Sequence, residues 1–238
     1  MNLAATLGKI AGGAPTVLRV VSREMPADLE TPVSAFLKLR DFGARILLES
    51  VESGTIIGRY SFICLQPNCK ITVGRDDLVI DDSSGSQVID HRGQDSPLAV
   101  LKNILGRIRI EGPDRQPRLL GGAVGYISYD FIRFFERIPA TDPDPLGLPL
   151  AVLYLVDTLL VFDHVQRQMK VLCLTEPGDE RAAQEKLDTV LGKLTSPLQL
   201  PAMDKTTRPH QEPTANITPA AFCETVNKVK QHITAGDV

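Results

Sequence analysis

The chain has 238 residues, 43% hydrophobic and 23% charged, a composition typical of a globular protein with one large domain or two small ones. Its net charge of −3 provides no basic field that would attract nucleic acid or an anionic membrane surface. No apolar run approaches the roughly 20 residues of a membrane span, and residues 1–15, rich in Ala and Gly, lack the pattern of a signal or transit peptide and are expected to form a flexible tail.

One helix and several short strands are predicted first along the chain. Thr31 before Pro32 is typical of a helix start and predicts a helix that runs to residue 40. An apolar run predicts a buried strand over residues 45–51. Three further β-type runs, separated by turn residues, predict an antiparallel meander over residues 61–65, 70–73 and 78–80. Residues 81–94 are polar, and we expect a loop there.

A second helix and a third are predicted by their caps and apolar stripes. Ser96 before Pro97 predicts a helix start. The inner face of that helix is expected to carry Leu98, Val100, Leu101, Ile104 and Leu105. Residues 179–194 predict another helix. Its expected stripe is Leu187, Val190, Leu191 and Leu194.

Further strands are predicted between these two helices. Residues 121–129 predict a strand, and residues 130–137 a short helix. Residues 151–162 form one long apolar run with Asp157 inside it, which predicts a single strand, and residues 169–175 are expected to pair with it. Strands with helices inserted between meanders, without regular β-α-β alternation, predict an α+β fold with mostly antiparallel, sandwich-like sheets and peripheral helices.

The last part of the chain predicts a linker and a helix. Residues 196–216 carry four prolines and few large apolar side chains, which is typical of a linker. Thr218 before Pro219 predicts the start of an amphipathic helix, which Gly236 ends. A helix that leads into the first residue of a strand implies a further sheet, so we expect this chain to be the front part of a larger protein.

The cysteines and histidines indicate no metal or nucleophilic site. The four cysteines form no CxxC pair and have no zinc-finger spacing, so we expect reduced and mostly buried thiols in a cytosolic protein. The four histidines are scattered without an obvious nucleophile partner, and no pair of carboxylates suggests a metal site. We therefore assign no catalytic residue and no metal ligand.

Two polar residues interrupt the apolar strand Leu-Leu-Glu-Ser-Val-Glu at residues 47–52. Side chains of a strand alternate between its faces, so Leu48 and Ser50 share one face and Glu49 lies on the other. An unpaired buried polar group costs about 1–3 kcal/mol. Two interpretations remain open: Glu49 pairs with Arg45 or Arg59 while Ser50 caps a turn, or the two residues bind a ligand.

Two further motifs have both a structural and a functional interpretation. Arg59 to Phe62 (Arg-Tyr-Ser-Phe) combines a cation, aromatic rings and a hydroxyl that could hold a small zwitterion, or is a turn that leads into a strand. The three glycines of residues 121–125 do not match a dinucleotide-binding fingerprint. Gly125 within a strand indicates a close backbone approach, and Asp130 is expected to cap a helix on which Arg133 and Glu136 are neighbours.

Four blocks together carry a family resemblance: residues 47–52, 58–63, 121–136 and 235–237. In this order, across residues 16–238, they resemble the amino-terminal half of anthranilate synthase component I, the chorismate-using subunit of tryptophan biosynthesis. The resemblance implies a regulatory α+β domain over residues 16–195 and, at residues 217–238, the first helix of a catalytic domain. In the family a strand follows the Ala-Gly-Asp segment, so we expect this chain to be truncated before the catalytic half.

The resemblance also implies an allosteric site for L-tryptophan, the feedback inhibitor. Ser50 is the best candidate to bind the amino-acid head group, and Glu49 lies next to it. The full set of candidate residues is Ser50, Glu49, Leu48, Arg59, Ser61 and Phe62. The other wall of the family's site belongs to the catalytic half.

The resemblance also implies a reaction, a metal ion and a partner subunit. The full-length enzyme, a carbon–oxygen lyase, converts chorismate and ammonia to anthranilate and pyruvate with Mg²⁺ held by glutamates. A glutamine amidotransferase subunit (component II) supplies the ammonia, so we expect a hetero-oligomer in the cytoplasm. None of the catalytic motifs occurs here, and we expect this chain to be inactive alone and to bind no cofactor.

Two alternatives compete with this interpretation. Aminodeoxychorismate synthase component I shares the fold, but Glu49-Ser50 and the Arg133/Glu136 spacing favour anthranilate synthase. A stand-alone amino-acid-binding module would have to fold independently. If the chain is a truncated part, unpaired sheet edges and an open apolar face predict that it is poorly soluble or oligomeric.

Overall fold

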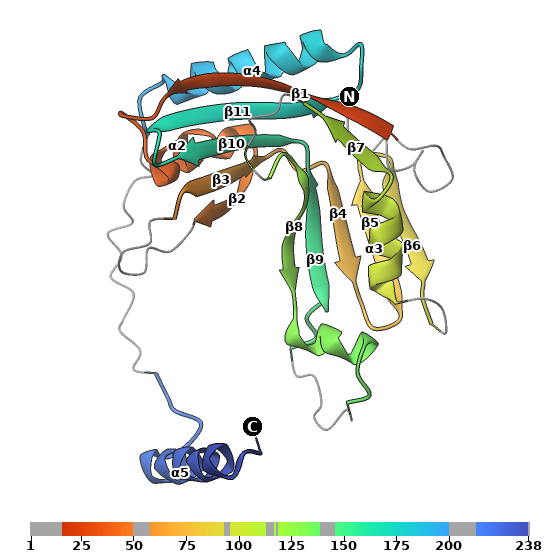
Figure 1. Ribbon diagram of the computed structural model, residues 1–238, viewed down its shortest axis with the longest axis vertical. Coiled ribbons are helices and arrows are strands. Elements are labelled where there is room, and N and C mark those ends of the chain that lie inside the picture. Colours follow the sequence, from red (N-terminus) through yellow and green to blue (C-terminus); the bar gives the residue numbers. More distant parts are fainter. Residues whose placement is uncertain are drawn as a thin grey trace. The chain divides into compact units, whose positions relative to one another are not determined.

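The computed structural model describes residues 16–49, 58–92, 96–112, 117, 119–138, 146–199 and 213–237. Contacts divide the chain into a first unit, residues 1–200, and a second unit, residues 201–238. The first unit contains two β-sheets with helices beside them (Figure 1). In the second unit the described element is one helix, α5 (Pro219–Ala235), which begins at the N-cap Thr218 and ends at Gly236.

Sheet 1 has six strands. Neighbouring strands are antiparallel, except for β1 and β7, which are parallel. In spatial order they are β2 (Ala44–Glu49), β3 (Tyr60–Leu65), β10 (Thr158–Asp163), β11 (Gln168–Thr175), β1 (Thr16–Pro26) and β7 (Ile108–Glu111). The central strands β10 and β11 are almost wholly buried, which explains their nearly continuous apolar sequence.

Sheet 2 has five strands, all antiparallel to their neighbours. In spatial order they are β6 (Gly85–Asp90), β5 (Asp77–Asp82), β4 (Cys69–Val73), β9 (Ala151–Val156) and β8 (Gly122–Ile127). β4 shows a strict alternation of buried and half-buried residues, because one of its faces packs into a core and the other is partly open.

Helices cover one face of each sheet. α2 (Pro32–Lys38) and α4 (Glu180–Leu194) pack on sheet 1 through a cluster that includes Ala35, Leu187 and Val190. α3 (Pro97–Leu105) and the 3₁₀ helix η2 (Tyr129–Phe134) pack on sheet 2. A short 3₁₀ turn, η1 (Arg40–Phe42), connects α2 to β2.

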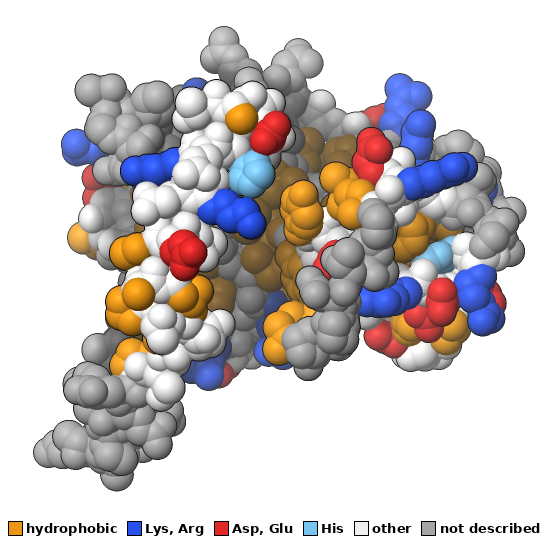
Figure 2. All heavy atoms as spheres, turned by 90° about the horizontal axis from the view of Figure 1, so that it is seen from below, with side chains coloured by type: hydrophobic (Ala, Val, Ile, Leu, Met, Phe, Trp, Pro, Cys, Tyr) orange, Lys and Arg blue, Asp and Glu red, His pale blue; other side chains and the backbone are white. Residues whose placement is uncertain are grey.

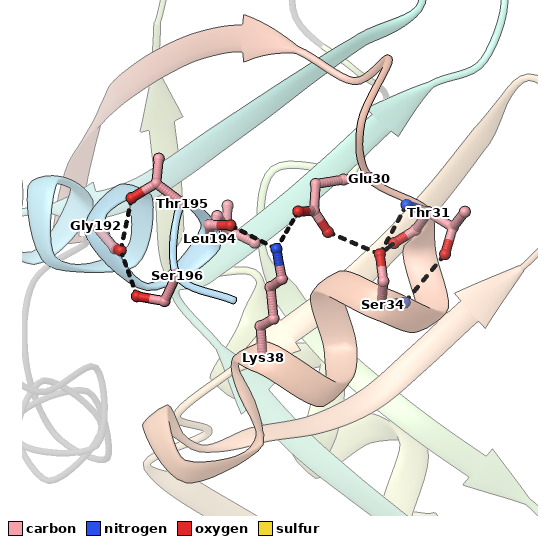
Figure 3. A network of polar contacts seen from close by, with 8 residues as sticks. All are labelled: Glu30, Thr31, Ser34, Lys38, Gly192, Leu194, Thr195 and Ser196. Carbon is pink, nitrogen blue, oxygen red and sulfur yellow. Dashed lines mark hydrogen bonds and ion pairs between the residues drawn. The ribbon is translucent and has the colours of Figure 1, made fainter. Parts of the chain in front are cut away.

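A nearly buried ion pair connects α2 to the end of α4 (Figure 3). The side chains of Lys38 and Glu30 are only 11% and 10% exposed, and they contact each other directly. Lys38 Nζ also donates to the carbonyl oxygen of Leu194 at 2.8 Å. Glu30 accepts a second hydrogen bond, 2.7 Å, from Ser34 Oγ, and Ser34 completes a capping box with Thr31. The pair therefore holds the loop before α2, α2 itself and the end of α4 together.

Asp157 separates two strands that the sequence predicts as one. The run 151–162 changes sheet at this residue: β9 belongs to sheet 2 and β10 to sheet 1. The buried carboxylate accepts hydrogen bonds from Thr158 Oγ1 at 2.7 Å, Lys186 Nζ at 3.3 Å and Asn68 Nδ2 at 3.3 Å. These hydrogen bonds offset the cost of burying the Asp157 carboxylate, which lies at the corner where the chain passes from one sheet to the other.

Several other predictions of strands need correction. The meander is wrong in part, because β3 pairs in sheet 1 while β4 and β5 pair in sheet 2. The expected loop over residues 81–94 contains β6, an edge strand. Its sequence, Gly-Ser-Gln-Val-Ile-Asp, is mostly polar and does not alternate between apolar and polar residues, so the hydrophobic pattern does not predict a strand there. β2 is not buried; it lies at the edge of sheet 1. β1 and β7 were not predicted.

The α+β fold class is confirmed, with two mostly antiparallel sheets and peripheral helices. The predicted helix starts at Thr31, Ser96 and Thr218 are confirmed by their capping hydrogen bonds. Three residues of the α4 stripe, Leu187, Val190 and Leu194, are buried as expected, and Leu191 is half-buried. Leu98 of α3 is exposed. The tail, residues 1–15, and residues 200–212 of the predicted linker lie outside the described residues.

The cysteines are free, and three of the four are buried. Burial raises the pKa of Cys64 to about 11. Burial, together with the nearby carboxylates of Asp82 and Asp81, raises that of Cys69 to about 12. Both thiols therefore stay protonated at neutral pH. Cys223 on α5 is exposed.

Candidate functional site

The candidate residues lie on the paired strands β2 and β3. The register places Leu48 opposite Phe62 and Glu49 opposite Ser61. Opposite residues of an antiparallel pair point to the same face, so Leu48 and Phe62 share one face of sheet 1, and Glu49 and Ser61 share the other. Ser50 follows directly but lies outside the described residues.

The face of Leu48 and Phe62 is the one that α2 and α4 leave open. Phe62 and Tyr60 pack against a cluster that includes Cys64 and Val161, and the two ring centroids are 6.0 Å apart. Leu48 is 38% exposed. This face therefore offers an apolar, partly accessible surface with two aromatic rings.

The face of Glu49 and Ser61 has a different chemistry. Ser61 is only 3% exposed, and its Oγ is hydrogen bonded to His164 Nε2 at 2.8 Å. The His164 ring stacks on Phe162. The Ser61 hydroxyl is thus already paired, and a ligand would have to displace His164 to reach it.

Arg59 forms a clamp at the start of β3. Its guanidinium donates to Asp163 Oδ2 from Nε at 3.1 Å and from an Nη at 2.9 Å, and lies 4.9 Å from the centroid of the Tyr60 ring. The proposed pairing of Glu49 with Arg45 or Arg59 is wrong: of these described residues, Arg59 pairs with Asp163, and Glu49 is exposed. An exposed carboxylate needs no buried partner.

Asp163 also organises the turn between β10 and β11. Its Oδ1 accepts hydrogen bonds from the backbone N–H groups of Val165 at 3.1 Å and Gln166 at 3.0 Å. Burial alone raises the pKa of the Asp163 carboxyl, but the hydrogen bonds from Arg59, Gln166 and Val165 outweigh it, and the pKa lies below its ordinary value of 3.8. The same hydrogen bond raises the pKa of Arg59.

A cavity of about 320 Å³ lies beside this clamp. The charged and aromatic groups in its lining are Glu24, Arg59, Tyr60, Asp163 and Lys170. Lys170 Nζ is 2.6 Å from Glu24 Oε1, so each cation has an anionic partner. Sequence reasoning missed Glu24, Asp163 and Lys170, because they come from β1, β10 and β11, and no local motif connects them.

The glycine-rich block serves packing. A Cβ on Gly125 would lie 1.9 Å from the carbonyl oxygen of Val152 on β9, which confirms the predicted close backbone approach. Asp130 forms no cap: the N-cap of η2 is Ser128, without a side-chain hydrogen bond. Arg133 pairs with Asp130 at 3.0 Å.

Among the described residues, no three His, Cys, Asp or Glu side chains come together in a way that could hold a metal ion. No helix in the described ranges is both long and apolar enough to span a membrane.

The fold, two mostly antiparallel sheets with peripheral helices, is shared with a solved structure. That structure is anthranilate synthase component I from Streptococcus pneumoniae TIGR4, with a TM-score of 0.52 and 23% identity, and the match covers 90% of this chain and 46% of that one. At this identity the likeness concerns the fold alone.

The sequence identifies the family. Residues 43–238 match the family described as chorismate binding enzyme, and the chain belongs to that family. Anthranilate synthase component 1 of Acetivibrio thermocellus is 32% identical over 228 residues, covering 92% of this chain and 46% of the relative. That of Pseudomonas putida is 34% identical over 223 residues, covering 90% and 45%. The chain thus spans less than half the length of these relatives.

The Asp163 clamp gives a prediction about pH. Because its pKa is lowered on folding, the ionised carboxylate stabilises the fold above the ordinary pKa of 3.8, and this contribution is lost as the pH falls through the lower folded-state value. We expect Asp163→Asn to lower the free energy of unfolding by about 1–2 kcal/mol at pH 7, with a smaller difference below pH 3.8.

Urea unfolding at several pH values measures this difference. Asp28→Asn, in an exposed position, is the matched control and should leave the stability unchanged at pH 7. An Asp163→Asn effect that persisted undiminished in acid would show that the carboxylate's charge is not what stabilises the turn.

Proposed function

We propose that this chain is the amino-terminal portion of an anthranilate synthase component I, the enzyme that converts chorismate and ammonia to anthranilate and pyruvate. The observation that carries the proposal is the 32–34% identity to anthranilate synthase component 1 proteins over about nine-tenths of the chain. Family membership supports a chorismate-like substrate, and the similarity to anthranilate synthase component 1 supports anthranilate as the product.

The chain's own part in that activity is regulatory. The candidate site for L-tryptophan comprises the end of β2 and the start of β3. Leu48 and Phe62 provide an apolar, aromatic surface suited to an indole ring. Ser50 follows Glu49 in the sequence, and in this proposal its hydroxyl binds the amino-acid head group. Glu49 and Ser61 face the other way, and Arg59 is held by Asp163, so these three are assigned to the support of the site.

The catalytic steps belong to the half of the relatives that this chain does not match. That half would supply Mg²⁺ ligands and chorismate contacts, and a glutamine amidotransferase subunit would supply ammonia to the assembled cytoplasmic enzyme. The 238-residue chain alone is expected to form no anthranilate from chorismate and ammonium. Co-expression with a catalytic half should produce fluorescent anthranilate, and activity of the chain alone would contradict the assignment.

Calorimetric titration with L-tryptophan tests the regulatory role. We expect saturable binding, in the chain or in a full-length subunit, that Ser50→Ala weakens and that Ser84→Ala, in the exposed β5–β6 turn, leaves unchanged. In a full-length subunit, Ser50→Phe should fill the site and abolish inhibition by tryptophan while activity without tryptophan persists. Inhibition that survives Ser50→Phe would place the effector elsewhere.

A further inference from the structure

We infer that the corner where the chain passes between the two sheets positions the candidate L-tryptophan site; this inference rests on the proposed function. The corner comprises residues 66–68, which connect β3 to β4, and Asp157, which connects β9 to β10. β3 and β10 are neighbours in sheet 1, and β4 and β9 are neighbours in sheet 2 (Figure 1). One antiparallel pair of strands therefore leaves sheet 1 and enters sheet 2 at a single place.

The corner contains a β-bulge. Between the last residue pair of sheet 1 and the first pair of sheet 2, one strand has three residues (66–68) and the other has two (156–157). An extra residue bends its strand, and bulges of this kind form corners at which strands change sheet. Gln66 has a φ of 45°, in the left-handed region that few residues other than glycine adopt, and Pro67 has no N–H for a strand ladder. Such a backbone persists only where surrounding contacts hold it.

Asp157 provides contacts that hold the corner. Red acidic side chains lie at the surface in Figure 2, the usual place for a carboxylate, whereas the side chain of Asp157 is only 5% exposed. Its carboxylate accepts hydrogen bonds at 3.3 Å from Asn68 Nδ2, across the corner, and from Lys186 Nζ of α4. Hydrogen bonds to an ionised acceptor are stronger than bonds between neutral groups. Asp157 therefore joins the two strands of the corner to each other and to α4.

The same corner anchors the start of β2. The backbone N–H of Gln66 donates to the carbonyl oxygen of Gly43, the residue before β2, at 2.8 Å. Gly43 has a φ of 90°, and a Cβ there would lie 3.0 Å from Cγ of Gln66, so the two segments are in close contact. Directly after this anchor, the register of β2 with β3 shifts between Ala44 and Ile46. The position of β2 on β3 therefore depends on where the corner holds Gly43.

The anchor decides which side chains form the candidate site. Residues 46–48 of β2 are all apolar, so alternation between apolar and polar residues does not select their register. A slip of one residue would turn Leu48 to the opposite face of the sheet, away from Phe62, which lies opposite it in the observed register. Asn68 is thus a positioning residue: its bond to Asp157 holds residues 66–68, and these residues hold the start of β2.

The variant Asn68→Ala tests the inference, because it breaks the bond across the corner and leaves Asp157 paired with Lys186. In a full-length subunit that contains this chain, we expect backbone hydrogen exchange in residues 44–49 to become about tenfold faster, while exchange in β5 and β6 stays unchanged. Asn68→Asp, which places a second carboxylate beside Asp157, should have a larger effect. The matched control Asn103→Ala, at an exposed position of α3, should change neither region.

Inhibition by L-tryptophan is the second measurement on the same subunit. For Asn68→Ala, the concentration that gives half-inhibition should rise about fivefold or more, while kcat and KM for chorismate without tryptophan stay within about twofold of the wild type. Unchanged exchange in β2, exchange that rises equally in β5 and β6, or activity that falls together with inhibition would overturn the inference. A wild-type subunit that tryptophan does not inhibit would contradict the proposed function instead, and exchange in β2 would still decide whether the corner holds this strand.

Discussion

Replacing Lys38 with methionine is expected to lower the free energy of unfolding by about 3–5 kcal/mol, the cost of leaving one partner of a buried ion pair unpaired. Glu30 would keep its hydrogen bond from Ser34 but lose its cation, and the carbonyl oxygen of Leu194 would lose its donor. Both charged side chains are about nine-tenths buried, so water cannot replace the lost contacts. Urea unfolding followed by circular dichroism measures the change.

Two controls separate the cost of an unpaired charge from the loss of a favourable contact. The double variant Lys38→Met/Glu30→Leu removes both charges and should recover most of the lost stability, because an apolar pair of similar volume is often as stable as the ions. Arg181→Met breaks a pair with Glu185 on the exposed side of α4, and should cost less than about 1 kcal/mol. If Lys38→Met had no larger effect than Arg181→Met, the buried pair would not hold α2 to α4.

Gly125→Ala should be the second strongly destabilising change, by about 3 kcal/mol. The added Cβ would lie 1.9 Å from the carbonyl oxygen of Val152 and 2.9 Å from the Cα of Leu153. Both atoms belong to the backbone of β9, so no side-chain rotation can relieve the overlap, and β8 must move away from its neighbour. Gly125 does not need a positive φ, so the expected cost comes from contact and not from backbone strain.

Gly192→Ala is the matched control for this change. Gly192 lies within α4, and a Cβ there would meet no atom within 4 Å. Alanine is favoured over glycine inside a helix by about 1 kcal/mol, so this variant should be slightly more stable than the wild type. Equal stability of Gly125→Ala and the wild type would mean that β8 and β9 are not in the close contact described above.

Local signals predicted the helices well. A helix start depends on residues three or four positions apart, and the pairs Thr31-Pro32 and Thr218-Pro219 carry the cap and the favourable first position in adjacent residues. The stripe of α4 repeats within a single helix, so its buried face could be read without knowing what covers it. The existence of most strands followed in the same way from short apolar runs.

The candidate site was predicted less completely. The sequence predicts strands over residues 45–51 and 61–65, and the family resemblance connects them to an effector. That β2 and β3 are neighbours in one sheet comes from the structure. Leu48 and Phe62 lie on one face of the sheet, and Glu49 and Ser61 lie on the other. This arrangement depends on the register between β2 and β3, which cannot be read from the sequence of either strand alone. The involvement of Asp163 and Lys170 depends on strands that lie far along the chain.

The sequence by itself determined the fold class, the family, the capped helices and the close approach at Gly125. Only the tertiary structure decided which strands share a sheet, that the run around Asp157 divides between two sheets, and that β2 and β8 lie at edges. The physical reason is how far apart in the sequence the interacting residues are. Caps and stripes are satisfied by neighbours within a few residues, whereas strand pairing and side-chain burial are satisfied by partners that folding alone brings together.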